Sequence, residues 1–250
     1  MKIVACIKRV PATDVIAQVG DDGKSLDPNG VQFMTSFYDE IAVEEAVRLK
    51  EKHGGETVVL TIGPSAASKE MRECLAKGAD SGSILVDENW SGRDPLSTAK
   101  ALQAKLTELA PDLVIMGRVA TDRDNGAVGP MLATLLGWSC VTDVTELEID
   151  GTSGTAKREG DAGIETYGFS LPAVITCQKD LNEPRYAGLK GIMAAKKKPL
   201  EESPCPEVAG SVEVVSLELP PARPEGRIVG EGPDAVPALI DALRNEAKVL

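Results

Sequence analysis

The first half of the chain contains short, continuous apolar runs separated by segments of helical periodicity. Such runs lie at residues 3–7, 57–62, 82–86 and 112–117. Strands that are apolar on both faces and alternate with helices are typical of a parallel sheet covered on two sides. The pattern therefore predicts an α/β fold whose ligands sit at the carboxyl ends of the strands, where the strand order switches.

The first helix is expected to begin at Ser36. Asp39, three residues later, completes a sequence that is typical of a capping box, and Gly54-Gly55 ends the helix. Glu44 and Arg48 are spaced as an i,i+4 ion pair on the polar side. Further helices are expected over 65–77, after Asp94-Pro95 with Asp94 as the N-cap, and over 131–136.

From about residue 140 the pattern changes. Short antiparallel strands are expected at 141–149, 155–158 and 165–169, followed by a last apolar strand at 171–176. Residues 201–226 are rich in Pro, Glu and Val and predict an extended segment, after which Gly232-Pro233-Asp234 begins a final helix. An arm with so little core of its own is expected to pack on another chain. We therefore divide the chain into an α/β domain, 1–200, and an arm with a terminal helix, 201–250.

The net charge of −12 disfavours a general nucleic-acid or anionic-membrane binder, because both need a positive field. The exception is Lys196-Lys197-Lys198, which is either a solvated strip or a docking surface. No apolar run is long enough to cross a bilayer, and the first nine residues read as a buried strand rather than a signal peptide. A cytoplasmic protein is expected.

Cysteine and histidine usage argues against a metal centre. The five cysteines, at 6, 74, 140, 177 and 205, have no CxxC spacing, and His53 is the single histidine. Buried free thiols are expected. With no histidine available as a general base near other candidate groups, the chain is expected to hold a cofactor or a partner rather than to catalyse with its own side chains.

The most informative loop runs from Gly117 to Pro130, between a buried strand and a helix. Gly126 and Gly129 would let backbone amides approach a ligand, and a helix N-terminus favours an anion such as phosphate. The loop is neither a P-loop nor GxGxxG. From spacing alone, nucleotide binding and a plain strand–loop–helix connection both stay open. The corresponding loops after residues 7 and 62 are further candidates for ligand contacts.

Segments of the second half of the chain carry a specific family signature. They are 158–165 (REGDAGIE), 171–176 (LPAVIT), 181–186 (LNEPRY), 191–193 (GIM) and 196–199 (KKKP), joined by 8–10 (KRV), 40–46 (EIAVEEA), 76–80 (AKGAD) and the loop 117–129. These residues resemble the electron transfer flavoprotein β (small) subunit over nearly the whole chain up to about 200. The resemblance implies a Rossmann-like parallel sheet with helices on both faces (adenine nucleotide alpha hydrolase-like), plus an antiparallel region and a C-terminal arm with a helix.

The resemblance also implies cofactors and the residues that bind them. FAD would be shared with the α subunit, which holds most of it, and the β-subunit site would hold AMP or, in electron-bifurcating members, a second FAD beside an NAD(H) site. Carried over by position, the cofactor-binding residues are Cys6, Ser36, Phe37, Tyr38, Asp39, Ile62, Asp122, Arg123, Asp124, Asn125, Gly126, Ala127, Val128 and Gly129. The loop favours the second flavin, although Asn125 replaces the threonine often found there.

The implied function is electron carriage. An α/β heterodimer would carry electrons between a flavin dehydrogenase, such as an acyl-CoA dehydrogenase, and a membrane quinone-reducing or ferredoxin/NAD-linked partner. By position, Leu189 is the leucine that docks in the partner, although Lys190-Gly191 replaces the usual Pro-Asn. The rival readings are a universal-stress type nucleotide-binding regulator on the same fold, or an ATP-hydrolysing or adenylyl-transferring enzyme.

Overall fold

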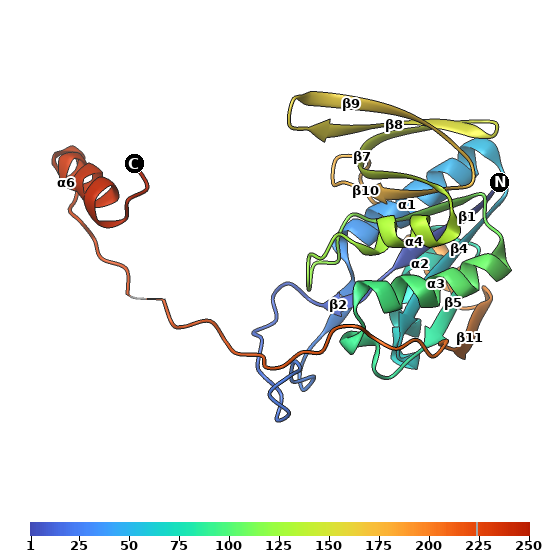
Figure 1. Ribbon diagram of the computed structural model, residues 1–250, viewed down its shortest axis with the longest axis horizontal. Coiled ribbons are helices and arrows are strands. Elements are labelled where there is room, and N and C mark those ends of the chain that lie inside the picture. The colour runs from blue at the N-terminus through green and yellow to red at the C-terminus, as the bar shows by residue number, and fades with distance from the viewer. Residues whose placement is uncertain (224) are drawn as a thin grey trace. The chain divides into compact units, whose positions relative to one another are not determined.

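The computed structural model describes residues 1–223 and 225–250, which divide into two units, Met1–Leu217 and Glu218–Leu250. Within these residues, the first unit is built on a nine-stranded sheet and a two-stranded ladder (Figure 1). The strands are β1 Lys2–Ile7, β2 Arg9–Pro11, β3 Phe33–Thr35, β4 Glu56–Gly63, β5 Ser81–Val86, β6 Leu113–Gly117, β7 Ser139–Asp150, β8 Ser153–Gly160, β9 Gly163–Ser170, β10 Ala173–Cys177 and β11 Leu200–Pro204. The first unit thus extends past residue 200, where the sequence pattern set the domain limit.

The large sheet has the order β11-β5-β4-β1-β6-β10-β7-β8-β9. Strands from β11 to β10 are parallel, β7 starts parallel to β10, and β7, β8 and β9 continue as antiparallel neighbours. The chain places β4 on one side of β1 and β6 on the other, so the strand order switches at β1. The mostly parallel sheet with an antiparallel region is confirmed.

Helices cover both faces of this sheet. They are α1 Phe37–His53, α2 Ser68–Lys77, α3 Pro95–Leu109, α4 Val128–Leu136 and α5 Leu189–Ala195. Successive side chains of a strand point to opposite faces. Accordingly, Ala5 of β1 packs in a core with α1 and α2, whereas Val4 packs in a second core with α3 and α4. The α/β class expected from the apolar runs is confirmed.

The start of α1 differs from the expected capping box. Ser36 is the N-cap residue but makes no side-chain capping bond. Asp39 instead accepts hydrogen bonds from two backbone amides outside the helix, Lys8 N at 2.7 Å and Gly117 N at 2.8 Å. The carboxylate therefore ties the ends of β1 and β6 together, because those strands end beside the first turn of α1.

The predicted ion pair between Glu44 and Arg48 does not form. Glu44 is buried and accepts hydrogen bonds from Arg185, while Arg48 contacts Glu45 at 3.3 Å. The segment before α5 crosses over α1 and turns its supposedly polar side into an interior surface. By contrast, Asp94 caps α3 as expected and accepts a bond from Ser97 N at 2.6 Å.

The edge strand β11 was not expected, because residues 201–226 were predicted to form an extended segment without a place in the sheet. Leu200–Pro204 pairs in parallel with β5 and adds a strand to the end of the sheet.

All five cysteines are free among the described residues, but Cys140 is exposed rather than buried. In the described part of the chain, no helix is long and apolar enough to cross a membrane.

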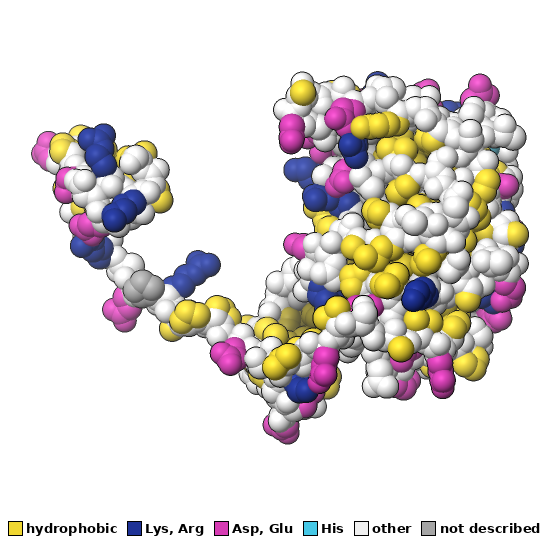
Figure 2. Space-filling view, viewed as in Figure 1, with side chains coloured by type: hydrophobic (Ala, Val, Ile, Leu, Met, Phe, Trp, Pro, Cys, Tyr) yellow, Lys and Arg dark blue, Asp and Glu magenta, His cyan; other side chains and the backbone are white. Residues whose placement is uncertain are grey.

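The second unit contains a short helical segment near the C-terminus. A 3-10 turn, Pro233–Ala235, leads into α6, Val236–Asp241, and a π-helical turn, Ala242–Glu246. Val236, Leu239 and Ile240 are each more than a third exposed. Figure 2 shows hydrophobic side chains on the surface of this helical segment. The unit therefore has little core of its own.

Candidate functional site

A cleft lies at the carboxyl ends of β1, β4 and β6, where the strand order switches. Open α/β sheets bind their ligands at this position. The cleft encloses about 890 Å³ of space, counting its open mouth.

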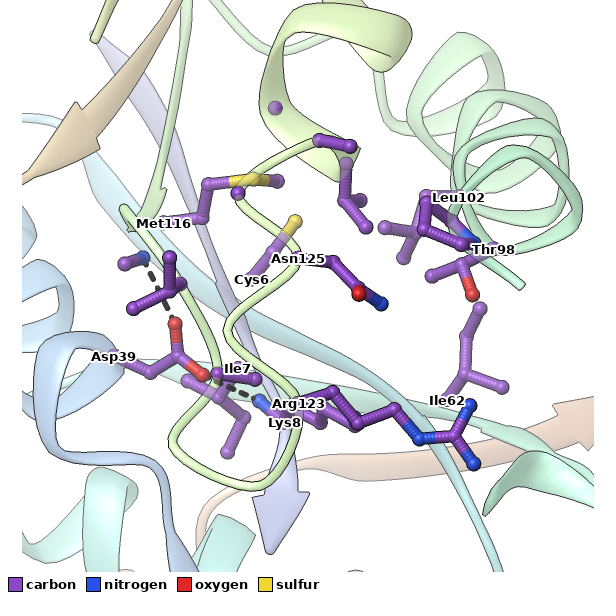
Figure 3. A pocket seen from close by; sticks show the side chains of 18 of the residues that line it. Cys6, Ile7, Lys8, Asp39, Ile62, Thr98, Leu102, Met116, Arg123 and Asn125 are labelled. Carbon is purple, nitrogen blue, oxygen red and sulfur yellow. Dashed lines mark hydrogen bonds between the residues drawn. The ribbon is translucent and has the colours of Figure 1, made fainter. Parts of the chain in front are cut away.

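The interior of the cleft is mostly apolar. Cys6 from β1, Ile62 from β4 and Met116 from β6 form part of its lining, and Leu102 of α3 faces them (Figure 3). Trp90, from a 3-10 turn before α3, adds a flat aromatic surface. Such a lining suits a planar heterocycle, because apolar and aromatic side chains can pack against its faces.

Asp39 lies at the inner end of the cleft, and its two amide donors fix it there (Figure 3). Burial raises the pKa of Asp39 to about 7, although the Lys8 and Gly117 amides and the Lys8 ammonium lower it and Asp122 raises it further. The group is 5% exposed. Its carboxylate therefore positions the strand ends around the cleft.

At two glycines of the cleft, Gly117 and Gly129, the backbone lies so close to neighbouring side chains that an added Cβ would clash. A Cβ at Gly129 would lie 2.5 Å from Thr176 Cγ2, and one at Gly117 would lie 2.6 Å from Asp39 Oδ1. These glycines let α4 begin directly against the sheet. Ala127, the N-cap of α4, makes no side-chain capping bond. The first-turn amides of α4 lack intrahelical acceptors and are available to an anion.

Four cationic side chains line the cleft: Lys8, Arg93, Arg118 and Arg123. Lys8 pairs with Asp122 at 2.6 Å, Arg118 with Asp143 at 2.7 Å, and Arg93 with Asp87. Arg123 differs, because its Nη2 donates to a backbone carbonyl, Ser91 O, at 2.6 Å. This contact joins the loop after β6 to the 3-10 turn Trp90–Gly92.

The structure brings many, but not all, of the expected cofactor-binding residues to the cleft. Those that line it are Cys6, Asp39, Ile62, Arg123, Asn125, Gly126, Ala127, Val128 and Gly129. Those outside the lining are Ser36, Phe37, Tyr38, Asp122 and Asp124. Ser36 Oγ accepts a hydrogen bond from Thr121 N, and Asp122 holds Lys8, so both support the loop that forms the wall. Cofactor binding by any of them stays a prediction.

A fourth loop contributes to the cleft and was missed. Trp90 and Arg93 lie in the connection after β5, the next parallel strand after β4, and Pro95 and Thr98 lie at the start of α3, which this connection leads into. The same rule that selected the loops after residues 7, 62 and 117 applies to the strand at 82–86. The carboxyl end of that strand was therefore the sequence feature from which this part of the cleft could have been predicted.

Among the described residues, no group of three or more His, Cys, Asp or Glu could hold a metal ion.

Leu189 lies far along the chain from the cleft residues, at the first position of α5, and is 79% exposed. Met193 and Ile192 on the same helix and Tyr186 before it are also exposed. Lys198 is not part of a free basic strip, since its Nζ donates to the carbonyls of Leu75 and Ala79 at the end of α2. Lys196 and Lys197 are exposed.

The fold is that of a Rossmann-like α/β protein with a cleft at the switch in strand order. Residues 26–208 match the family model described as "Electron transfer flavoprotein domain". The chain is 41% identical over 253 residues to "Electron transfer flavoprotein subunit beta" of Bradyrhizobium diazoefficiens, and 35% identical over 261 residues to the same subunit of Bacillus subtilis. Both alignments cover the whole of both chains.

A mitochondrial β subunit from Oryza sativa subsp. indica is 39% identical over 257 residues, again across the full length of both chains. The β subunit of Syntrophomonas wolfei is 36% identical over 251 residues, covering the whole of this chain and 98% of the relative. This chain belongs to the electron transfer flavoprotein β-subunit family.

Proposed function

We propose that the chain works as the β subunit of a heterodimeric electron transfer flavoprotein. Its α-subunit partner holds most of an FAD, and this chain supplies one wall of that site. Family membership over the full length supports the assembly. The observation that carries the nucleotide part of the proposal is the apolar cleft that opens at the free N-terminus of α4.

We propose that this cleft holds the adenylate group common to AMP and FAD. The base would pack among Trp90, Leu102 and Ile62, which are cleft residues from three different segments. The phosphate would lie at the first turn of α4, where Gly129 keeps the backbone open. When bound, FAD would supply the redox chemistry; AMP would have a structural role. A second FAD would permit electron bifurcation with NADH as donor.

The surface around Leu189 is the proposed docking site for a flavin dehydrogenase, with the acyl-CoA class as the first candidate. An exposed leucine beside Ile192 and Met193 offers an apolar anchor, and Lys190, Lys196 and Lys197 supply charge around it. We expect Leu189→Ala to slow reduction of the heterodimer by the dehydrogenase at least about tenfold, without changing its flavin content. Unchanged stopped-flow reduction rates would remove Leu189 from the docking site.

The deciding experiment is the ratio of flavin and AMP to protein in the co-expressed heterodimer. The visible absorbance of the intact pair gives its flavin content. Chromatography of an acid extract then separates FAD from AMP and gives the amount of each. Two flavins without AMP would support the bifurcating type, whereas one of each would exclude a second tightly held flavin. A colourless pair would contradict the electron carrier and favour a nucleotide-binding regulator.

A further inference from the structure

We propose that Arg72 and Lys198 are positioning residues for partner docking, because they hold α5, and with it Leu189, in a fixed orientation on the surface. Their role rests on the proposed docking site around Leu189. Leu189, at the first position of α5, is 79% exposed. The position of such an exposed side chain depends mainly on how firmly its helix is held.

The helix α5 is too short to be stable by itself. It has seven residues, and an isolated helix shorter than about 12–15 residues is marginal in water. Ala195 at its end is 2% exposed and packs in the core that also contains Met71 and Leu75 of α2. Ile192 and Met193 face solvent instead. Contacts with α2 therefore have to supply much of the stability of α5.

Two cations join the C-terminal ends of α2 and α5. Arg72 of α2 donates from Nη1 to Ala195 O at 2.6 Å and to Lys198 O at 2.7 Å. Lys198, which follows α5, donates from Nζ to Leu75 O at 2.9 Å and to Ala79 O at 2.5 Å. The last carbonyls of a helix lack intrahelical partners and carry partial negative charge, so cations stabilise them. Each helix end is thus capped by a cation from the other segment.

The backbone of α5 also lies directly against α2. A Cβ at Gly191 would clash with the backbone oxygen of Ala76. Before α5, Arg185 is bonded to Glu44 of α1, and after it β11 pairs with β5. The chain is therefore anchored on both sides of α5, and the two cations hold the helix itself.

A docking anchor that is held in place before the partner arrives loses less conformational freedom on binding. If α5 opened locally, Leu189, Ile192 and Met193 would be presented together in only a fraction of the molecules. The apparent affinity for the partner would fall by that fraction. Arg72 and Lys198 therefore favour docking by raising the population of the competent conformation, and neither needs to contact the partner.

The test follows electron transfer from a substrate-reduced acyl-CoA dehydrogenase to the intact, flavin-loaded αβ pair. In Arg72→Gln we expect the KM for the pair to rise about fivefold or more and kcat to change less than about twofold, because fewer molecules present α5 for docking. Flavin content and the rate of direct reduction by dithionite, which needs no docking, should match the wild type. Amides of α5 should exchange with deuterium faster in the variant.

Lys69→Gln is the matched control, because it removes one positive charge from an exposed position on the same helix. It should leave the KM and the exchange of α5 unchanged. Arg72→Lys keeps a cation that can donate to the same carbonyls and should restore part of the docking. Lys198→Gln removes the other half of the contact and should raise the KM in the same direction as Arg72→Gln.

A double variant shows whether Arg72 acts through Leu189. When Leu189→Ala is already present, Arg72→Gln should raise the KM less than about twofold further, since the anchor that it positions is gone. Fully additive effects, an unchanged KM in Arg72→Gln or unchanged α5 exchange would overturn the positioning role. An unchanged KM in Leu189→Ala would overturn the docking site itself, and Arg72 would then hold α5 only for the fold.

Discussion

Asp39 shows how one residue can serve the fold in a way that local sequence does not reveal. Its position three residues after Ser36 predicts a capping role, yet its carboxylate bonds to the amides of Lys8 and Gly117. Those residues are 31 and 78 positions away in the chain. The interaction depends on the end of β6 lying next to the end of β1, which helix-capping rules cannot anticipate.

Asp39 should make the free energy of unfolding depend on pH between about 4 and 7. Its folded pKa of about 7 lies above the usual aspartate value near 4, so folding favours the protonated form between these values. The free energy of unfolding should therefore fall as pH rises from about 4 to about 7 and level off above. The Asp39 contribution between pH 5.5 and 8 is about 2 kcal/mol.

Chemical denaturation of Asp39→Asn at several pH values measures this contribution. The variant should be less stable at pH 5.5 by about 1–3 kcal/mol, because its amide NH2 faces a backbone donor. Its stability should fall less steeply toward pH 8 than that of the wild type. Parallel pH profiles for the two proteins would show that Asp39 does not titrate in this range.

Arg185 is expected to be the most important single ion-pair residue for stability. It donates from Nε and Nη2 to the buried Glu44 carboxylate and from Nη1 to Glu51 at 2.6 Å. Arg185→Ala leaves the Glu44 carboxylate buried without its cation. We expect a loss of about 2–3 kcal/mol, below the usual range for a fully buried pair because the Arg185 side chain is 35% exposed.

A double-mutant cycle with Glu44→Gln isolates this pair. The double variant should be more stable than the sum of the single losses predicts, because removing both charges leaves none unpaired. Arg48→Gln is the control and should cost less than about 0.5 kcal/mol, since its contact with Glu45 involves a half-exposed guanidinium. A cost below about 1 kcal/mol for Arg185→Ala would mean that water reaches Glu44.

At the scale of elements, α4 and the loop before it determine the shape of the cleft. The helix begins directly against β10, since Gly129 leaves no room for a side chain beside Thr176. Gly129→Ala should push the first turn of α4 away from the sheet. We expect a destabilisation of about 1–3 kcal/mol and weaker AMP binding, measured by thermal unfolding and calorimetry.

Gly92→Ala is the control for this substitution. Gly92 lies in the turn that carries Trp90, but an added Cβ there meets no atom within 4 Å. Stability and AMP affinity should stay close to the wild-type values. If the two variants behave alike, the close approach at Gly129 does not define the site.

The helices and strands were largely predictable from the sequence. Which of them pair or pack beside one another was less predictable. The runs at 57–62 and 112–117 appear as β4 and β6 because burial on both faces leaves a continuous apolar signature. β11 was missed, since none of its residues is fully buried and an edge strand of this kind has no such run. Its pairing with β5 joins residues more than 110 positions apart, and no local pattern reports that contact. The part of the cleft that contains Trp90 was missed, because ligand contacts were expected at the carboxyl ends of β1, β4 and β6 but not at that of β5.

At the scale of the whole molecule, the apolar surface of the second unit needs a covering partner. Leu239 is 45% exposed and Ile240 is 40% exposed in Glu218–Leu250, which has little core of its own. Exposed apolar groups of this kind mark interaction sites. We predict that this unit packs on the α subunit and gains most of its order there.

Hydrogen–deuterium exchange of the full chain, alone and with its α subunit, measures this. Amides of α6 should exchange rapidly in the isolated chain and at least about tenfold more slowly in the pair, because an ordered interface suppresses local opening. Amides of β4, buried in both states, should be protected throughout. Leu239→Ala should weaken subunit association, whereas Asp234→Ser, a polar change in the preceding turn, should not. Equal α6 exchange with and without the α subunit would show that the terminal helix packs elsewhere, and the exposed apolar side chains would then need a different partner.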